Sequence, residues 1–499
     1  MLVFYLKEFV GSVVMKYRCS ICGKVVQSNE KNCPYCGVSP EFFELITEDI
    51  EEDIPKITGL IPIADDNHSI CRITEKCIKC GRCSVVCQEQ VGVRYNPKKA
   101  QRPVCLGCGQ CVLNCPVGAI VPKYSYKKVM DYIKDTSKVV VAFTSPAVRV
   151  ALGEEFNSAQ VNVEGKMVTA LKKLGFHYVF DTTFGADLTV MEEAFELVER
   201  MKENKRLPQF TSCCPAWVRY MEIYHPKLLP YLSSCKSPIA MQGAIIKNYF
   251  SEMMEIPKED IVAVAITPCT AKKSEILRSG QTDTDYVITT SELAILLREQ
   301  KEDFENLQDT PFDSIMSRGS GAGVIFGSSG GVMEAAVRTA YYFITKKEPP
   351  KNLLHFKSVR GYDAIKEATV IIDDKELHLL VIHGMTNVEP YLKKLEVETL
   401  DYDFIEVMNC PGGCVGGGGQ PLGVISKQKE TIEKRITSLY QEDEMVPIRM
   451  SYQNPDIKTL YQSYLGSPLS KKAREILHTN YVDESGILGC LLYTSPSPR

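Results

Sequence analysis

The chain has 499 residues and a formal net charge of -4, with 44% hydrophobic and 24% charged residues. These values are typical of globular proteins, and at about 150 residues per domain the length predicts about three or four folded units. The slightly acidic balance excludes the basic surface that nucleic acid requires. No apolar run reaches the ~18 residues of a membrane span, and Lys7 and Glu8 interrupt the N-terminal stretch. We therefore expect a cytoplasmic protein with no membrane or nucleic-acid partner, beginning at Met1 or Met15.

The first cysteines in chain order are Cys19 with Cys22 and Cys33 with Cys36, both pairs with C-x2-C spacing. Four such thiolates can close a tetrahedral site for one metal ion. Residues 15–45 resemble the short rubredoxin-like domain of rubrerythrins. One iron there would be a redox centre and one zinc would only hold the fold. The spacing does not separate the two metals, although we expect iron.

Eight cysteines between residues 77 and 115 form two runs with the spacing C-x2-C-x2-C-x3-C. The fourth cysteine of such a run usually binds the cluster of the other run. We therefore assign one 4Fe-4S cluster to Cys77, Cys80, Cys83 and Cys115, and a second to Cys87, Cys105, Cys108 and Cys111. Zinc is the alternative metal, but interleaved sets with this inner spacing are rarely zinc sites. Residues 69–125 resemble a bacterial two-cluster ferredoxin, and crossed ligands would make the two clusters an electron relay.

From residue 138 onward, short apolar runs alternate with helical patterns. The runs are rich in Val and Ile and are bounded by Gly, Pro or Asp, as buried strands are: residues 139–143, 261–266, 378–382 and 404–408. The helical patterns include residues 188–203 and 333–342. This alternation predicts an α/β fold with mostly parallel sheets. A polar helical segment follows the last strand.

Three further cysteine motifs stand where predicted strands end. They are TSCCPAW at residues 211–217, TPCTAKK at residues 267–273 and MNCPGGCVGGGGQP at residues 408–421. Because ligands collect beyond the carboxyl ends of strands in open α/β sheets, cysteines about two hundred positions apart can converge on one further cluster. The glycines after Cys414 are expected to let the backbone approach a bulky inorganic group.

Together these motifs resemble the three signature motifs of iron-iron hydrogenases, and the resemblance covers residues 69–484. It implies a two-lobed α/β domain holding an H-cluster, which is a 4Fe-4S cubane joined to a two-iron subsite with carbonyl, cyanide and azadithiolate ligands. By this resemblance the cubane ligands are Cys214, Cys269, Cys410 and Cys414, and Cys414 bridges to the two-iron subsite. The resemblance also implies reversible reduction of protons to H2, ferredoxin as the electron carrier, and maturation proteins that build the cofactor.

The resemblance assigns roles to several polar residues as well. Its proton path maps onto Cys213, Glu193, Ser233, Glu196 and Arg200. The two glutamates and the arginine are spaced three and four apart on one predicted helix face, and a solvated charged face is the alternative. Lys272 would contact a cyanide of the cofactor. The pocket would be lined by Ser145, Pro146, Thr267, Phe326 and Met408, with an ordinary core position as the alternative for Phe326.

Four positions depart from the commonest family pattern: Thr267, Ala216, Ala271 and Ile239 stand for methionine, glycine, serine and glutamine. We expect them to alter catalytic tuning and to leave cluster assembly intact. The substitution Thr267→Met restores a soft thioether beside the two-iron site, so we expect it to change the ratio of H2 evolution to H2 uptake. Matched electrochemistry of the two proteins measures this ratio, and an unchanged ratio would count against a tuning role for Thr267.

The sequence therefore divides into an extension (1–14), a rubredoxin-like domain (15–45), an acidic linker (46–68), a two-cluster domain (69–125), an H-cluster domain (126–424), a helical segment similar to a hydrogenase small subunit (425–484) and a tail (485–499). The tail, which contains Cys490, resembles translated sequencing-adapter sequence. Cys71 is interpreted as a bystander near a cluster and Cys235 as a small buried hydrophobe.

Two alternative functions come from other classes of protein. One is a non-catalytic iron-sulfur scaffold of the Narf type, against which the retained Cys213, Lys272 and acid path argue. The other is an H2 sensor, for which no signalling module is visible in the sequence. No G-x-G-x-x-G motif follows a predicted strand, so a nicotinamide partner would need another subunit.

Overall fold

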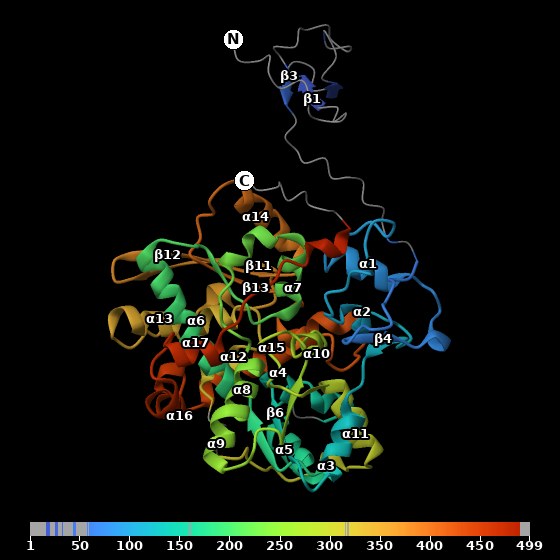
Figure 1. Cartoon of the computed structure of the whole chain (residues 1–499), viewed down its shortest axis with the longest axis vertical. Helices are drawn as coiled ribbons and strands as arrows, with labels where there is room; N and C mark the ends of the chain where they lie inside the picture. The colour runs from blue at the N-terminus through green and yellow to red at the C-terminus, as the bar shows by residue number, and fades with distance from the viewer. Residues whose placement is uncertain are drawn as a thin grey trace, which may run out of the picture. The chain divides into compact units, whose positions relative to one another are not determined.

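The computed structural model divides the chain into two compact units, Met1–Pro55 and Lys56–Arg499. It describes residues 57, 59–158, 161–314, 316 and 319–489, together with Asn32 and three short strands before them. Those strands are β1 (Lys16–Cys19), β2 (Val25–Gln27) and β3 (Phe43–Leu45), and they form an antiparallel sheet in the order β2-β1-β3 (Figure 1). The extension, Cys22, Cys33, Cys36 and Cys490 lie outside the described residues. The metal site predicted for the N-terminal cysteines thus stays a prediction.

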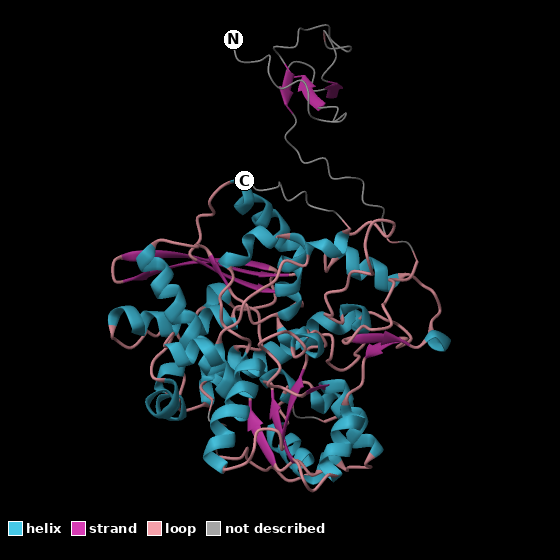
Figure 2. Cartoon of the chain, viewed as in Figure 1, coloured by secondary structure: helices cyan, strands magenta, loops and turns pink. Residues whose placement is uncertain are grey.

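The larger unit contains two four-stranded sheets, which Figure 2 shows apart from each other with helices between and around them. The first sheet has the order β10-β9-β6-β7 and consists of β6 (Val139–Thr144), β7 (Tyr178–Asp181), β9 (Ile261–Thr267) and β10 (Tyr286–Thr289). The second has the order β11-β12-β13-β8 and consists of β8 (Gln209–Phe210), β11 (Ile365–Ile372), β12 (Lys375–His383) and β13 (Phe404–Met408). The predicted α/β fold with mostly parallel sheets is confirmed.

The first sheet is parallel throughout, because helices cover both of its faces. All seven residues of β9 are buried. Alternate residues of its strands pack against α6 (Thr183–Glu203) and α8 (Pro238–Ile245) on one face, and against α5 (Glu164–Leu174) and α11 (Thr290–Glu299) on the other. Burial on both faces is why these strands read as continuous apolar runs in the sequence.

The second sheet is mixed, because β11 runs antiparallel to β12 while β12, β13 and β8 are parallel. The sequence pattern missed β11. Its residues alternate between exposed and buried positions along much of the strand, so no continuous apolar run marks it. This edge strand lies far from the cysteine motifs in the sequence, whereas β8 and β13 lead directly into two of them.

The segment before the first sheet carries the two cysteine runs. Its elements are β4 (Ile70–Arg72), α1 (Arg82–Glu89), α2 (Gln110–Leu113) and β5 (Ile120–Pro122), with β4 antiparallel to β5. Ile57, in the expected linker, exchanges backbone hydrogen bonds of 2.8 and 2.9 Å with the Gln88 side chain. This segment belongs to the same compact unit as the two sheets.

The remaining helices surround the sheets. They are α3 (Tyr126–Lys134), α4 (Pro146–Arg149), α7 (Pro215–Tyr224), α9 (Ser251–Met254), α10 (Lys272–Glu275), α12 (Gly321–Ile325), α13 (Gly331–Thr345) and α14 (Met385–Val397). The C-terminal helices are α15 (Gln428–Met445), α16 (Pro455–Leu460) and α17 (Lys471–Leu477). In the expected tail, the Ile487 carbonyl accepts a 3.0 Å hydrogen bond from the Gln101 amide. None of the described helices has the length and apolarity to cross a bilayer.

Candidate active site and cluster-binding cysteines

One cavity of about 70 Å³ lies where strands of both sheets end. The strands β6, β9 and β13 end at Thr144, Thr267 and Met408, and each is followed directly by residues that line the cavity. The site residues predicted from the sequence that line it are Ser145, Pro146, Cys213, Cys214, Thr267, Cys269, Lys272, Phe326, Met408, Cys410 and Cys414. The fold therefore brings three distant motifs to one place, at the carboxyl ends of parallel strands.

Four cysteines around this cavity form a set of thiol donors. Burial raises the pKa of the Cys269 thiol to about 11, and the neighbouring Cys214 adds to the rise. Burial is also the main cause of the raised pKa of Cys410 and of Cys414, and the charges of Cys269 and Cys214 add to the rise. Thiols that perturb one another in this way are close together in a dry environment. Four such donors fit a 4Fe-4S cubane, which would take them as thiolates.

The glycines after Cys414 make a contact different from the predicted one. A Cβ at Gly416 would lie 2.2 Å from the Pro411 carbonyl oxygen, and one at Gly417 would lie 2.5 Å from that of Pro268. Real Cβ atoms essentially never approach protein atoms so closely. These glycines therefore fold the loop against neighbouring backbone, and only Gly417 also lines the cavity.

Gly418 joins the loop to the cysteine-rich segment. A Cβ there would lie 2.4 Å from the Cys108 carbonyl oxygen and from the Gly109 Cα, which are backbone atoms that cannot turn aside. We expect Gly418→Ala to separate the two segments, to lower the thermal unfolding midpoint and to slow electron delivery. Anaerobic thermal unfolding and dye-driven reduction of the clusters measure both effects. Gly423→Ala is the control, because that position has no atom within 4 Å of an added Cβ. Equal losses in the two variants would contradict this role.

The eight cysteines between residues 77 and 115 gather in two groups. Cys77, Cys80, Cys83 and Cys115 line a second cavity together. Burial raises the pKa of Cys87, and the charges of Cys108 and Cys105 add to the rise. The same holds for Cys111, where Cys105 and Cys87 are the leading neighbours. In both groups the fourth cysteine of one run lies beside cysteines of the other run.

The second group lies next to the active-site cavity. Cys108 contributes to the raised pKa of Cys410, after burial and two closer cysteines. The Asn409 side chain donates to Cys410 Sγ over 3.7 Å, and it opposes the rise that burial causes in the pKa of Cys108. The Gln110 side chain also donates to the Gly416 carbonyl over 2.9 Å. Asn409 was missed by the sequence analysis, although it stands between a predicted strand and a ligand cysteine.

Lys272 is buried at the wall of the cavity, where it begins the short helix α10. Its Nζ donates to the Cys213 carbonyl oxygen over 3.0 Å and lies 2.9 Å from a carboxylate oxygen of Glu275. Burial is the largest single influence and lowers the pKa of Lys272, but Glu275 together with Cys269 and Cys213 outweighs it, so the pKa is raised. The Ser237 hydroxyl also donates a hydrogen bond of 3.0 Å to the Glu275 carboxylate. Glu275, three residues after Lys272, is a site residue that the sequence analysis did not name.

The predicted acid residues lie on α6 and beside it, and they are buried. Glu193 is fully buried and Glu196 is 8% exposed, so the alternative of a solvated charged face is excluded for both. Among the described residues the Glu193 carboxylate makes no well-formed hydrogen bond, although the nearby Ser233 side chain and Ser212 backbone act to lower its pKa. Burial, reinforced by the charge of Glu196, raises its pKa from 4.5 to about 8. Glu193 in turn adds to the raised pKa of Cys213.

The next residues form a hydrogen-bonded line. The Ser233 hydroxyl donates to Glu196 Oε2 over 2.9 Å, and Arg200 Nη2 donates to Glu196 Oε1 over 2.6 Å. The side chains of Glu196 and Arg200 are each 10% exposed, so this line reaches the edge of the buried region. Glu193 acts on Cys213 and is itself acted on by Ser233, while Ser233 and Arg200 both bind Glu196.

The four unusual positions are all buried near the cavity. Thr267 and Ile239 line it directly, whereas Ala216 and Ala271 pack in the apolar cluster behind it. The cavity lining therefore differs from the commonest family pattern at two residues, with Thr267 in place of methionine and Ile239 in place of glutamine. Phe326 also lines the cavity, so both its predicted place at the pocket and its apolar environment are observed.

The comparisons with known proteins agree with this geometry. Residues 138–418 match the family model of the iron only hydrogenase large subunit, C-terminal domain, and residues 429–484 match that of the iron hydrogenase small subunit. The chain therefore belongs to the iron-only, or FeFe, hydrogenase family. This is a family of iron-sulfur, metal-binding oxidoreductases that carry an H-cluster.

Several relatives are similar over most of their length. The NADP-reducing hydrogenase subunit HndD of Solidesulfovibrio fructosivorans is 42% identical over 84% of this chain and 75% of its own. Iron hydrogenase 1 of Clostridium pasteurianum is 41% identical over 81% and 74%. Protein NAR1 of Arabidopsis thaliana is 30% identical over 77% and 87%. The solved apo FeFe-hydrogenase HydA1 of Chlamydomonas reinhardtii has a TM-score of 0.63 at 38% identity, over 72% of this chain and 98% of its own.

Proposed function

We propose that this protein is a hydrogenase that interconverts protons and H2 and exchanges electrons with a small carrier such as ferredoxin. The observation that carries the proposal is the cavity at the ends of β6, β9 and β13. Four cysteines, a buried lysine and the first residue of a buried acid path meet there. A structural iron-sulfur site would need the four thiols, but it would not need the lysine or the acids.

In this proposal the chain binds three clusters in its larger unit. The H-cluster would be held by Cys214, Cys269, Cys410 and Cys414, with one 4Fe-4S cluster in each group of the cysteine-rich segment. When bound, the H-cluster supplies the iron site at which protons and electrons combine. The N-terminal cysteines would hold one Fe or Zn. Maturation proteins would insert the two-iron subsite, and the protein would work in the cytoplasm.

The side chains around the cavity would bind and orient the cofactor. Lys272 presents a cation whose position is fixed by Glu275 and by the Cys213 carbonyl. A cation in a dry cavity interacts strongly with an anionic ligand, since no water screens the charge. Ser145, Pro146, Thr267, Phe326 and Met408 would shape the remaining wall and exclude water. The arrangement is rigid, because every one of these residues follows or packs on a sheet strand or a buried helix.

The acid path would move protons between the cavity and the surface. Glu193, with a pKa of about 8, is poised to hold and release a proton near neutral pH. The Ser233 hydroxyl can donate to Glu196 and accept in the same step, so it links the two carboxyl groups. Arg200 holds Oε1 of Glu196, and the Ser233 hydroxyl donates to Oε2, which also accepts from the Ser234 amide. Cys213 would pass the proton between Glu193 and the cavity.

The names of the relatives support one alternative function and one alternative electron carrier. The relatives named Protein NAR1 and cytosolic iron-sulfur assembly component 3 are 30% and 31% identical to this chain, which makes a scaffold the second candidate. An H2 sensor would use the same cavity at low turnover. The relative named as an NADP-reducing subunit suggests a different carrier, which would require a nicotinamide-binding partner.

The test is infrared spectroscopy of protein matured anaerobically with the cofactor-building proteins. A hydrogenase or a sensor is expected to show carbonyl and cyanide stretches, and a scaffold is not. H2 production from chemically reduced ferredoxin then separates the enzyme from the sensor. A protein with intact clusters but without these stretches would overturn the proposal.

A further inference from the structure

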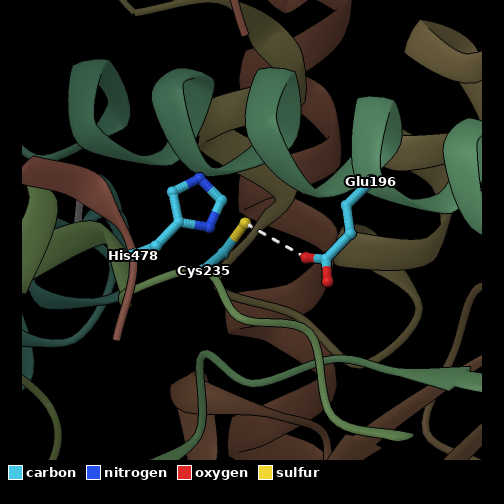
Figure 3. Close-up of side chains that lie close together, drawn as sticks. All are labelled: Glu196, Cys235 and His478. Carbon is cyan, nitrogen blue, oxygen red and sulfur yellow. Dashed lines mark hydrogen bonds between the residues drawn. The ribbon is translucent and has the colours of Figure 1, made fainter. Parts of the chain in front are cut away.

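A second group of metal-binding side chains lies beside the acid path, and the predicted roles leave its cysteine and histidine unexplained. It consists of Glu196, Cys235 and His478, which come from α6, from the loop before α8 and from the residue after α17 (Figure 3). Their ligand atoms all lie within 4.8 Å of one another. Cys235 was interpreted from the sequence as a small buried hydrophobe, and this contact gives its thiol polar neighbours.

The backbone fixes two of the three residues face to face. Cys235 and His478 form an isolated antiparallel bridge, flanked by hydrogen bonds of 2.8 Å from Lys236 to Leu477 and from Thr479 to Ser234. In a pair flanked by hydrogen bonds in this way, the two side chains leave the same face of the ladder at close range. The thiol and the imidazole are therefore held together independently of any contact between them.

Separate partners hold the third residue and orient the imidazole. Arg200 binds Glu196 Oε1 over 2.6 Å, while Oε2 accepts from the Ser233 hydroxyl and the Ser234 amide and lies 3.9 Å from Cys235 Sγ. His478 Nε2 lies 2.9 Å from Glu192 Oε2, and the Tyr461 hydroxyl and the Leu469 amide hold that carboxylate in turn. A carboxylate on one imidazole nitrogen is the usual support of a metal-binding histidine, because it leaves the other nitrogen unprotonated.

We propose that Glu196, Cys235 and His478 form a binding site for one soft divalent cation, with Zn²⁺ as the best match. Sulfur, nitrogen and carboxylate oxygen are the donors that zinc prefers, at ~2.3, ~2.0 and ~2.1 Å in a tetrahedron. Such bonds place sulfur and oxygen roughly 3.6 Å apart, only a few tenths of an ångström closer than they are here. His478 Nδ1 also lies 2.8 Å from the Ser234 hydroxyl, which can supply the fourth donor.

Zinc at this position would inhibit turnover, a consequence that rests on the proposed function. Glu196 Oε2 accepts the hydrogen bond of Ser233, which is the link between the two carboxyl groups of the acid path. A cation bound to that oxygen competes with the Ser233 hydrogen bond and lowers the basicity of the Glu196 carboxylate. Proton transfer would stop at this point while the clusters and the active-site cavity stay unchanged.

The experiment compares zinc binding and H2 evolution in the anaerobically matured protein. Equilibrium dialysis against Zn²⁺ is expected to leave one more zinc per chain on the wild type than on Cys235→Ala or His478→Gln. Dye-driven H2 evolution should fall at least tenfold at saturating zinc, recover with EDTA, and resist zinc in Cys235→Ala. Cys71→Ala and His225→Gln, which change a cysteine and a carboxylate-paired histidine elsewhere, should behave like the wild type.

Equal zinc content in the wild type and both site variants would overturn the metal site. Zinc bound at the expected stoichiometry with undiminished turnover would support the site and overturn its inhibitory effect on Glu196. If the protein evolves no H2 at all, the proposed function fails, and zinc content alone still decides whether the site exists.

Discussion

Replacing Glu193 by glutamine is expected to lower H2 evolution and uptake at least about 100-fold, which is the lower end of what a positioned proton carrier contributes. The amide has nearly the same shape as the carboxyl group but cannot take up and release a proton. Cluster content and the infrared bands of the active site should be unchanged, because Glu193 is not a cluster ligand in our assignment. Dye-driven assays in both directions measure the loss.

The same substitution is expected to change how stability depends on pH. The folded-state pKa of Glu193, about 8, lies above its ordinary value of 4.5, so the folded protein keeps a proton that the unfolded chain releases. The stabilisation that protonated Glu193 contributes to the fold is complete below pH 4.5. It is lost as the pH rises toward 8, by up to about 1.4 kcal/mol per pH unit. Glu193→Gln removes this loss, so its unfolding midpoint relative to the wild type should rise from pH 5 to pH 8.

The control for both effects is Glu199→Gln on the same helix, where the side chain is 44% exposed. It should leave both activity and the pH dependence of stability unchanged. A Glu193→Gln protein with full activity would remove Glu193 from the proton path. A relative midpoint that stays constant with pH would show that the carboxyl group is ionised without penalty in the folded protein.

Lys272→Met is expected to abolish turnover and to destabilise the protein by about 3–5 kcal/mol, because it leaves the buried Glu275 carboxylate without its cation. The double variant Lys272→Met/Glu275→Gln should regain most of this stability, since the Ser237 hydroxyl can still donate to the amide oxygen. Anaerobic thermal unfolding of the three proteins measures the recovery.

Activity should separate the two roles of Lys272. If its ammonium contacts a cofactor ligand, the double variant stays inactive although its stability has returned. Recovery of H2 evolution in the double variant would mean that Lys272 only balances Glu275. Infrared band positions add a second readout, because loss of a cation beside a cyanide should shift the cyanide stretch.

Much of the site could be predicted because cysteine spacing carries chemical information. Two runs with C-x2-C-x2-C-x3-C spacing define two ligand sets, and the structure gathers Cys77, Cys80, Cys83 and Cys115 around one cavity. The strand at residues 404–408 was also predicted with its observed bounds, because four of its five residues are apolar and all five are buried. β11 lacked that pattern, since its side chains alternate between solvent and protein.

Other parts depend on contacts between residues that are far apart in the sequence. Nothing beside Cys235 in the sequence indicates His478, which lies opposite it in the backbone bridge. The glycines after Cys414 were expected to face a cluster, but most of them meet neighbouring backbone. Glu275 and Asn409 stand next to named motif residues, and only their contacts reveal what they do.

The sequence by itself determined the ligand chemistry, because the spacing of each cysteine run determines which thiols can bind one cluster. It also determined the fold class, through the alternation of apolar runs and helical patterns. Only the tertiary structure decided which carboxyl groups are buried away from water. Glu193 and Glu199 lie on the same helix, but Glu193 is fully buried and Glu199 is exposed. Burial arises from packing between segments that are distant in the sequence, and it determines the free energy needed to ionise each group.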